Sequence, residues 1–117
     1  MKPLAQYIIA ENKAGLFAAR RQSDGSRCPR VYLPGGALGA RETLEGLCAR
    51  QGWRISRGDK IHEEETERYK VQWFTGTAEP SGFTQKSTPQ WADRDTIERH
   101  EHLHDGALDA YEEMKGA

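Results

Sequence analysis

Short apolar stretches separated by turn residues occupy the first third of the chain. Tyr7–Ala10 and Leu16–Arg20 have the composition of two strands, and Asn12–Gly15 between them has the composition of a turn. The segment Gln22–Pro29 is rich in polar residues and predicts a loop, after which Val31–Leu33 predicts a third short strand. We therefore expect the chain to begin with a strand hairpin, followed by a loop and a further strand.

An amphipathic helix is predicted over Thr43–Gln51. Its apolar residues recur at the i, i+3 and i+4 spacing of a helical face and are Leu44, Leu47 and Cys48. Gly52 is placed to end this helix, and apolar Trp53 then opens an extended segment. The periodicity therefore changes from helical to strand-like at Gly52.

The clearest strand pattern lies at Tyr69–Ala78. One face of this strand is strongly apolar and the other is mixed, because side chains alternate between the two faces of a strand. The apolar face carries Tyr69, Val71 and Trp73, and the mixed face carries Lys70, Gln72 and Phe74. Such a strand is expected to lie inside a sheet or at an interface.

The remaining elements surround that strand. They are a charged stretch at Asp59–Glu67, a turn at Glu79–Gly82 and a short strand at Gln90–Asp93. A final helix is predicted over Ala107–Met114, and Asp105 is placed to cap it. The order of strands and helices indicates one α/β domain over residues 1–117.

Composition and charge restrict the class of protein. The chain has 117 residues, of which 36% are apolar and 30% charged, which is typical of a small globular domain. Lys and Arg number 17 against 18 Asp and Glu, so the net charge of −1 predicts neither nonspecific nucleic-acid binding nor a membrane-surface partner. No apolar run is long enough for a membrane span, and we expect no signal peptide.

The cysteine content favours a reducing compartment. Cys28 and Cys48 are too few for a disulfide scaffold and do not have zinc-site spacing. Cys48 lies on the apolar face of the predicted helix and is expected to be a small buried side chain. A cytoplasmic location is the default expectation.

The segment Leu33–Ile55 contains a recognisable loop and helix. Pro34, Gly35 and Gly36 form a turn that leads through Glu42 into the helix. Gly36, five residues and Glu42, followed by a helix that ends at a glycine, resemble the signature of the Nudix hydrolase family. The 16 positions from Gly36 to Gly52 are five fewer than the family signature has, and the Arg-Glu pair of the signature falls in the missing part.

The resemblance implies a Nudix-like α/β/α sandwich with a mixed central sheet, a short signature helix and a C-terminal helix. In the family, glutamates of the signature helix bind Mg²⁺ or Mn²⁺ against a diphosphate, and one carboxylate helps to activate water. Here Ala49 and Arg50 fall where the family has its metal-binding glutamate pair. Hard divalent cations need several oxygen ligands, so this replacement predicts loss of metal-dependent hydrolysis.

The missing residues cannot be replaced by a simple shift along the helix. Five residues correspond to roughly 7.5 Å of helix and to a net rotation of about 140°. The remaining acidic residues would therefore lie on a different face. We expect the ordinary catalytic mechanism of the family to be disabled.

Several residues around this loop are candidates for a surviving site. Glu42 and Glu45 lie three apart, so they can share a helical face as a catalytic, metal or phosphate site. The alternative, which we favour, is that both carboxylates only stabilise the positive end of the helix dipole. Gly35 and Gly36 allow a tight turn and also a close approach of the backbone to a ligand phosphate.

Arginines near the loop offer a way to bind phosphate without a metal. Five arginines surround the loop in the sequence: Arg20, Arg21, Arg30, Arg41 and Arg50. Of these, Arg41 and Arg50 are the candidates to bind a phosphate directly through their guanidinium groups. If the chain is an active enzyme, the metal ligands would instead be Glu42, Glu45 and Glu64, with Mg²⁺ or Mn²⁺ as cofactor. Glu64 belongs to the run Glu63–Glu67, for which a solvated hairpin end is the favoured interpretation.

Three histidines form a second candidate site. His100, His102 and His104 alternate beside Glu101 and Asp105, as transition-metal ligands can. Because the flanking sequence predicts a loop before a helix, we expect a polar, solvent-exposed segment rather than a metal site.

Aromatic side chains are numerous for so short a chain: Trp53, Tyr69, Trp73, Phe74 and Trp91. Most are expected in the core or at a subunit interface, and one of them can stack on a nucleobase.

Three functions remain open at this level. The first is a Nudix-like domain without metal-dependent hydrolysis that binds a nucleotide-like or phosphate-containing ligand or a partner protein. The second is an atypical Nudix hydrolase that cleaves a nucleoside diphosphate-linked substrate. The third is a structural module that forms a homodimer through an aromatic strand. The altered glutamate positions favour the first.

Overall fold

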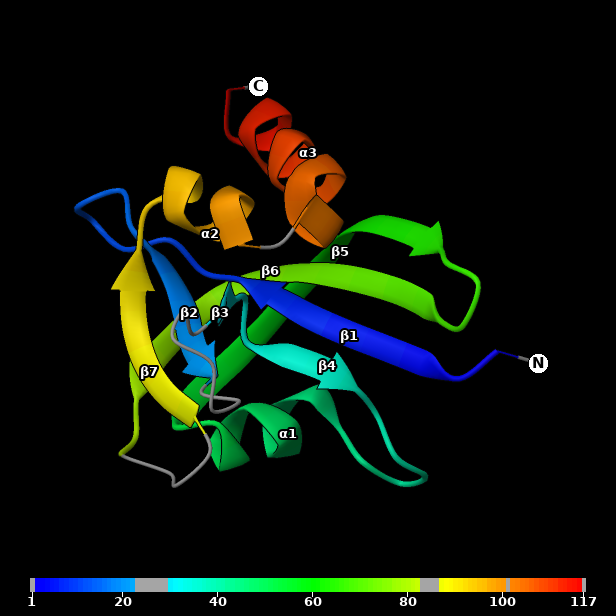
Figure 1. The fold of residues 1–117 in the computed structure, drawn as a ribbon. Helices are drawn as coiled ribbons and strands as arrows, with labels where there is room; N and C mark the ends of the chain where they lie inside the picture. Colours follow the sequence, from blue (N-terminus) through cyan, green and yellow to red (C-terminus); the bar gives the residue numbers. More distant parts are fainter. Residues whose placement is uncertain (1, 23–29, 83–86, 101, 117) are drawn as a thin grey trace.

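The computed structural model describes residues 2–22, 30–82, 87–100 and 102–116, which form two β-sheets and three α-helices (Figure 1). The strands are β1 (Leu4–Ile9), β2 (Phe17–Gln22), β3 (Arg30–Tyr32), β4 (Gly35–Ala37), β5 (Trp53–Glu65), β6 (Lys70–Pro80) and β7 (Ser87–Ala92). The helices are α1 (Leu44–Arg50), α2 (Arg94–His100) and α3 (Asp105–Gly116), with a 3₁₀ turn at His102–His104 before α3.

The larger sheet is mixed, as expected. Its strand order is β4-β1-β6-β5, and β1 runs parallel to β6 with Tyr7 opposite Trp73. The β1–β4 and β5–β6 pairs are antiparallel. Over Lys70–Thr75, which includes Trp73 and Phe74, β6 is flanked by β1 and β5, so this part of the strand has no free edge for pairing with a second copy of the chain.

The expected hairpin of the first two strands forms only next to its turn, where the Asn12 N–H donates to the Leu16 carbonyl and the Ala18 N–H to the Ala10 carbonyl, each at 2.8 Å. β2 belongs to a separate antiparallel sheet of order β3-β2-β7, and an isolated bridge between Glu11 and Phe17 joins it to the end of β1. The turn itself is as expected, because the Asn12 carboxamide accepts hydrogen bonds from the backbone of Ala14 and Leu16. β1 pairs with β6 instead because Ile8 and Ile9, on its opposite faces, are both fully buried and need cover on both sides.

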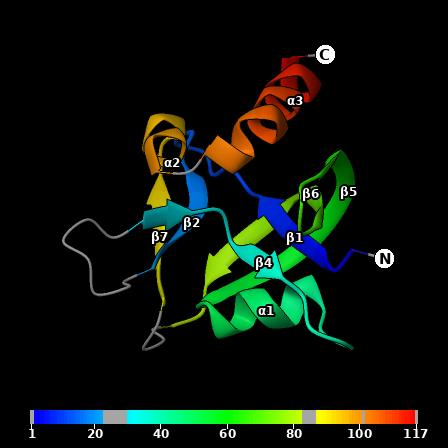
Figure 2. The same cartoon turned by 45° about the vertical axis from the view of Figure 1, so that its right-hand side comes forward.

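Helices cover both faces of the larger sheet (Figure 2). α1 packs on one face, where its apolar side chains meet Ile8 and Trp53. α2 and α3 lie on the other side, where Ile97 and Leu108 join a second cluster around Trp73. This is the α/β/α arrangement expected from the sequence.

The aromatic residues divide between core and surface. Trp53 and Trp73 are fully buried, and the Trp53 indole N–H donates to the Ala19 carbonyl at 2.7 Å, which joins the two sheets. Phe74 and Trp91 are half-buried against the core. Their placement confirms the expectation that most of these rings serve packing.

Two local expectations need correction. Gly35 and Gly36 are not only a turn but part of β4, which pairs with β1. Glu79–Pro80 ends β6 rather than forming a turn. The run Glu63–Glu67 lies where β5 turns into β6, which confirms the expected hairpin end. β5 contains register shifts between Arg57 and Lys60 and directly after Lys60.

The histidine segment also differs from the expected exposed loop. Arg94–His100 is helical and His102–His104 is a 3₁₀ turn. His102 is exposed, but His104 is fully buried. Cys48 is buried as expected, and burial raises the pKa of its thiol to about 12. Cys28 and Glu101 lie outside the described residues.

None of the helices in the described part of the chain is long and apolar enough to span a membrane.

Candidate functional site

The short helix α1 is held by a cap at its start and by apolar contacts along its length. The Thr43 hydroxyl accepts a hydrogen bond from the Gly46 N–H at 3.1 Å and so satisfies one of the unpaired donors of the first turn. The predicted apolar face is confirmed, because Leu44, Leu47 and Cys48 are all buried. The helix has seven residues, so little of it remains to carry a catalytic face.

The end of α1 is fastened to β4 by a residue that the sequence pattern did not single out. Gln51 accepts a hydrogen bond from the Gly35 N–H at 2.9 Å and donates one to the Gly35 carbonyl at 2.8 Å. Gly35 has φ near +133°, and a Cβ there would lie 2.1 Å from the Gln6 carbonyl oxygen. Only glycine fits this position, and the Gln51 amide takes the place of a neighbouring strand.

The two candidate catalytic carboxylates have different partners. Glu42 precedes the N-cap Thr43 and lies outside α1, so the expectation that Glu42 and Glu45 share a helical face is wrong. Glu42 forms an ion pair with Arg50 and also accepts from the Gly39 N–H at 3.2 Å. Glu45 forms an ion pair with Arg57 at 3.1 Å.

Glu63 and Glu64, in the glutamate run at the end of β5, also have side-chain partners. Glu63 lies 2.6 Å from the Lys60 ammonium and 3.0 Å from that of Lys70, and these hydrogen bonds lower the pKa of its carboxyl to about 2. Glu64 lies 3.0 Å from His62 Nε2. The Glu63 and Glu64 carboxylates therefore each have a side-chain partner.

These side chains do not fit a magnesium or manganese ion. Within the described ranges, Glu42, Glu45 and Glu64 belong to no group of three or more ligands that could hold a metal. Ala49 supplies no oxygen, and the guanidinium of Arg50 already occupies the Glu42 carboxylate. A divalent cation would have to displace that guanidinium and then remain beside its positive charge.

A pocket of about 380 Å³ lies between the two sheets, a size within the range of small-molecule sites. Its lining residues come from both sheets, the β5–β6 turn and the 3₁₀ turn: Ala5, Tyr7, Arg20, Tyr32, Gly36, Ala37, Thr66, Tyr69, Val71 and Leu103. Gly36 is thus the one predicted ligand-binding residue among the lining residues of this pocket. Gly35, Arg41 and Arg50 are not among them.

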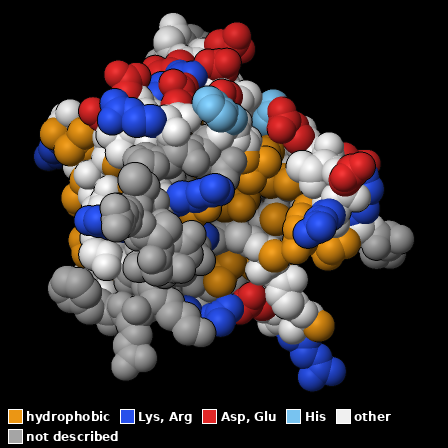
Figure 3. Space-filling view, viewed as in Figure 1, with side chains coloured by type: hydrophobic (Ala, Val, Ile, Leu, Met, Phe, Trp, Pro, Cys, Tyr) orange, Lys and Arg blue, Asp and Glu red, His pale blue; other side chains and the backbone are white. Residues whose placement is uncertain are grey.

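The described lining residues of the pocket include no acidic side chain, although Glu65 and Glu67 flank Thr66 in the sequence. In Figure 3, hydrophobic side chains and those of Lys or Arg are seen in the middle of the face, and many of the acidic side chains lie over α2 and α3 and at the end of β5 and β6. The Arg20 guanidinium lies 5.1 Å from the centre of the Tyr32 ring. Burial lowers the pKa of Arg20, but an arginine remains charged at neutral pH.

A buried histidine stands behind one wall of the pocket. The Trp73 indole N–H donates to His104 Nδ1 at 2.9 Å, which places the proton of the neutral imidazole on Nε2. The His104 ring also meets the edge of Tyr7, with 4.7 Å between ring centres. Burial, together with the charge of Arg20, lowers the pKa of His104 to about 3.

Sequence comparisons identify no relative: no protein-family model matches the chain, and no curated protein does. Solved structures do match. A Nudix hydrolase from Nitrosomonas europaea has a TM-score of 0.74 at 12% identity, covering 98% of this chain and 91% of that one. A MutT structure, from work on Aliivibrio salmonicida and Vibrio cholerae, has a TM-score of 0.65 at 13% identity, covering 93% and 95%.

A MutT protein from Methanosarcina mazei Go1 has a TM-score of 0.53 at 22% identity, covering 97% of this chain and 94% of its own. Structural similarity at such low sequence identity supports a shared fold, but it does not show a shared chemistry of the site. Three observations lead to the same conclusion: the arrangement of the two sheets, the loop and helix at Gly36–Gly52, and the structural matches. The chain has the fold of the Nudix hydrolases.

Proposed function

We propose that this protein binds a nucleotide-like, phosphate-containing ligand in the pocket between its sheets and does not carry out metal-dependent diphosphate hydrolysis. The ion pair between Glu42 and Arg50 carries this proposal. Glu42 matches the first glutamate of the Nudix signature, and its carboxylate is bound by the side chain that stands in place of a second glutamate.

The charge balance explains why a metal is disfavoured. A cation held by oxygen ligands is stabilised by negative charge on every side, whereas here one ligand position carries +1. Removing one partner from a charged pair also leaves the other uncompensated. The same site therefore favours an ion pair within the protein over a metal ion.

The pocket offers groups that can bind a phosphate-containing ligand without a metal ion. A positive guanidinium and three tyrosines line it, and Gly36 lets the backbone approach closely. Guanidinium groups bind phosphate oxygens by charge-assisted hydrogen bonds without any metal.

The test is a hydrolysis assay with nucleoside triphosphates, dinucleotides and nucleotide sugars, in Mg²⁺ and separately in Mn²⁺. Glu42→Gln serves as the control for contaminating activity. We expect equal, background turnover for both proteins. Metal-dependent turnover that Glu42→Gln abolishes would refute the proposal and favour the atypical hydrolase.

Calorimetric titration with Mn²⁺ alone gives a second readout. We expect no saturable binding by the protein, and none by Arg50→Gln, because removing the cation restores no oxygen ligand. Tight binding by the unmodified chain would show that the ion pairs open for a metal.

A further inference from the structure

The outer border of β4 carries one pair of backbone hydrogen-bonding groups that the fold leaves open beside the pocket. We infer that the pocket recognises a planar ring, such as a nucleobase, that carries an N–H donor next to an acceptor atom, and that this edge of the ring pairs with the backbone N–H and C=O of Ala37. The inference rests on the proposed function, because it assumes a nucleotide-like ligand in this pocket.

The pairing of β4 with β1 fixes the direction of these backbone groups. The Leu38 N–H donates to the Leu4 carbonyl at 2.9 Å. In an antiparallel pair, such hydrogen-bonded positions alternate with positions whose backbone groups point away from the partner strand. Ala37, opposite Ala5, occupies one of these other positions, and Gly35 occupies the one before it. Because β4 is a border strand of the larger sheet, their N–H and C=O groups point outward (Figure 1).

Gly35 shows how a planar group can satisfy such an outward pair. Its N–H donates to the Gln51 carboxamide oxygen at 2.9 Å, and its carbonyl accepts from the carboxamide nitrogen at 2.8 Å. One flat group therefore supplies both an acceptor and a donor to a single residue. Ala37 presents the same two groups about 7 Å further along the border, which leaves room for a second flat group beside the Gln51 amide.

Ala37 has no corresponding partner. Within the described ranges, no residue forms a hydrogen bond with its outward N–H or C=O. Ala37 is exposed, and it lines the pocket together with Ala5, the residue opposite it on β1. A ligand in the pocket can therefore reach these two groups.

The neighbours of Ala37 along the border exclude a longer partner. An added peptide strand would need open groups at every second residue. Gly35 is already paired with Gln51. On the other side, the Gly39 N–H donates to the Glu42 carboxylate at 3.2 Å, and the Gly39 carbonyl accepts from the Glu42 N–H at 3.1 Å. One open pair between two closed ones fits a small planar group and not a strand.

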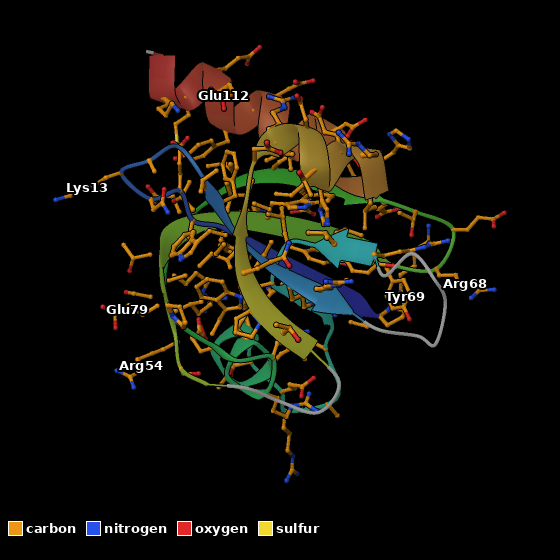
Figure 4. The ribbon with its side chains drawn as sticks, turned by 60° about the vertical axis from the view of Figure 1, so that its left-hand side comes forward. Lys13, Arg54, Arg68, Tyr69, Glu79 and Glu112 are labelled. Atoms are coloured by element: carbon orange, nitrogen blue, oxygen red, sulfur yellow. The ribbon has the colours of Figure 1, made fainter. Side chains whose placement is uncertain are left out.

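Aromatic side chains from both sheets line the same pocket. Tyr7 comes from β1, Tyr32 from β3 and Tyr69 from the position directly before β6. In Figure 4, Tyr69 lies against the body of the molecule, whereas its neighbour Arg68 points away from it. The Thr66 hydroxyl accepts from the Tyr69 N–H at 3.0 Å, so this wall is ordered before a ligand binds. Rings on separate walls favour a planar ligand by stacking and edge contacts.

Nucleobases have the edge that this site requires. Adenine carries an amino N–H beside a ring nitrogen that accepts, and purine without the amino group keeps the acceptor but loses the donor. A site built to pair with a donor disfavours an analogue that lacks it, because the Ala37 carbonyl then stays unpaired in the complex.

The first experiment compares two nucleotides that differ only in this edge. AMP and purine riboside monophosphate, which is AMP without its amino group, are titrated into the full chain by calorimetry in EDTA. We expect the purine analogue to bind about three- to tenfold more weakly than AMP. Ribose phosphate, which lacks the ring, should show no saturable binding. Equal affinity of AMP and either analogue overturns the inference.

Hydrogen exchange measures the contact directly. At a concentration of AMP about 100 times its dissociation constant, exchange of the Ala37 amide should slow by at least about tenfold, as followed by NMR of the isotope-labelled chain. The Gly35 amide, already bound to Gln51, is the control and should change little. Protection of Ala37 that appears without ligand as the protein concentration rises would assign the border to a second copy of the chain and overturn the inference.

A proline variant removes the donor from the border. Ala37→Pro should weaken AMP binding about tenfold, and a border strand tolerates proline where the N–H points outward. Ala40→Pro is the matched control, outside the pocket lining. The hydrogen bond from the Glu42 N–H to the Gly39 carbonyl places Ala40 at the second position of a turn, where proline is favoured. If Ala37→Pro does not fold, the purine comparison and the exchange measurement still decide.

The outcomes separate this inference from the proposed function. AMP binding in EDTA that leaves the Ala37 amide unprotected overturns the inference and leaves metal-free binding in place. Binding that requires Mg²⁺ and leads to turnover overturns both. No binding of AMP overturns the inference, while the hydrolysis assay still decides whether catalysis is absent.

Discussion

The Gln51 side chain fastens the glycine loop to the end of α1 through two hydrogen bonds with Gly35. It satisfies both polar groups of the Gly35 peptide in a buried position, where water cannot replace it. This arrangement keeps β4, and with it the Gly36 wall of the pocket, at a fixed distance from α1.

Replacing Gln51 tests this role. Gln51→Leu should lower the free energy of unfolding by about 2–4 kcal/mol, because a buried donor and a buried acceptor lose their partners. Urea unfolding measures the change, with Gln90→Leu on the half-buried strand β7 as control. An equal effect of both variants would contradict the assignment.

His104 predicts a specific acid sensitivity. The unfolded chain binds a proton at the ordinary histidine pKa of 6.5, whereas the folded protein keeps the ring neutral until about pH 3. Between these values the unfolded state holds more protons, so stability falls as the pH is lowered, by on the order of 5 kcal/mol in full. Above pH 6.5 the effect is absent.

The variant His104→Gln should remove this part of the pH dependence while still accepting the Trp73 hydrogen bond. Urea unfolding between pH 7 and pH 4 should give a flatter profile for it than for the unmodified chain. His102→Gln, at the exposed neighbour, should keep the original slope. A slope unchanged in His104→Gln would mean that other groups govern acid unfolding.

At the scale of elements, the short helix α1 relies on its first turn. A helix of seven residues is far below the length at which helices are stable alone, so its cap matters more than usual. Thr43→Ala should lower the free energy of unfolding by about 1 kcal/mol. Denaturant unfolding measures this, with exposed Thr77→Ala on β6 as control. A smaller loss in Thr43→Ala than in the control would show that tertiary packing alone holds the helix.

The sequence predicts elements well where side chains repeat at a clear period. The ends of the helix predicted at Thr43–Gln51 and of the strand predicted at Tyr69–Ala78 lie within two residues of the ends of α1 and β6. Both predictions rest on an apolar face with regular spacing. Gly35–Gly36 carries no side chains and hence no alternation, so β4 could not be recognised. α2 was missed for a related reason: its one apolar residue, Ile97, gives no periodic face.

The site was predictable only in part. Gly36 and Glu42 follow a local spacing, which a sequence displays directly. The pocket combines Arg20, Tyr32 and Tyr69 from three separate strands or their ends, and the pairing of distant strands brings them together. The burial of His104 likewise depends on where α3 packs, which no local pattern reveals.

At the scale of the whole molecule, the pocket joins two sheets that share few backbone contacts. A ligand that touches both should therefore stabilise the entire fold. At a concentration about 100 times its dissociation constant, AMP should add about 2.7 kcal/mol and raise Tm by about 10 °C in EDTA. Thermal unfolding followed by circular dichroism measures the shift, with adenosine as control. Saturating AMP without a rise in Tm would place its binding outside the folded core.

The long strand β5 forms one border of the larger sheet, and its middle is exposed from Ser56 to Lys60. There the two register shifts described above interrupt the ladder, and Arg57, Asp59 and Lys60 place charges of both signs along it. A regular, uncharged border would act as a template onto which further chains add and grow into fibrils. The irregular and charged border of β5 offers no such template, so growth of the sheet by addition of further chains is disfavoured along this border.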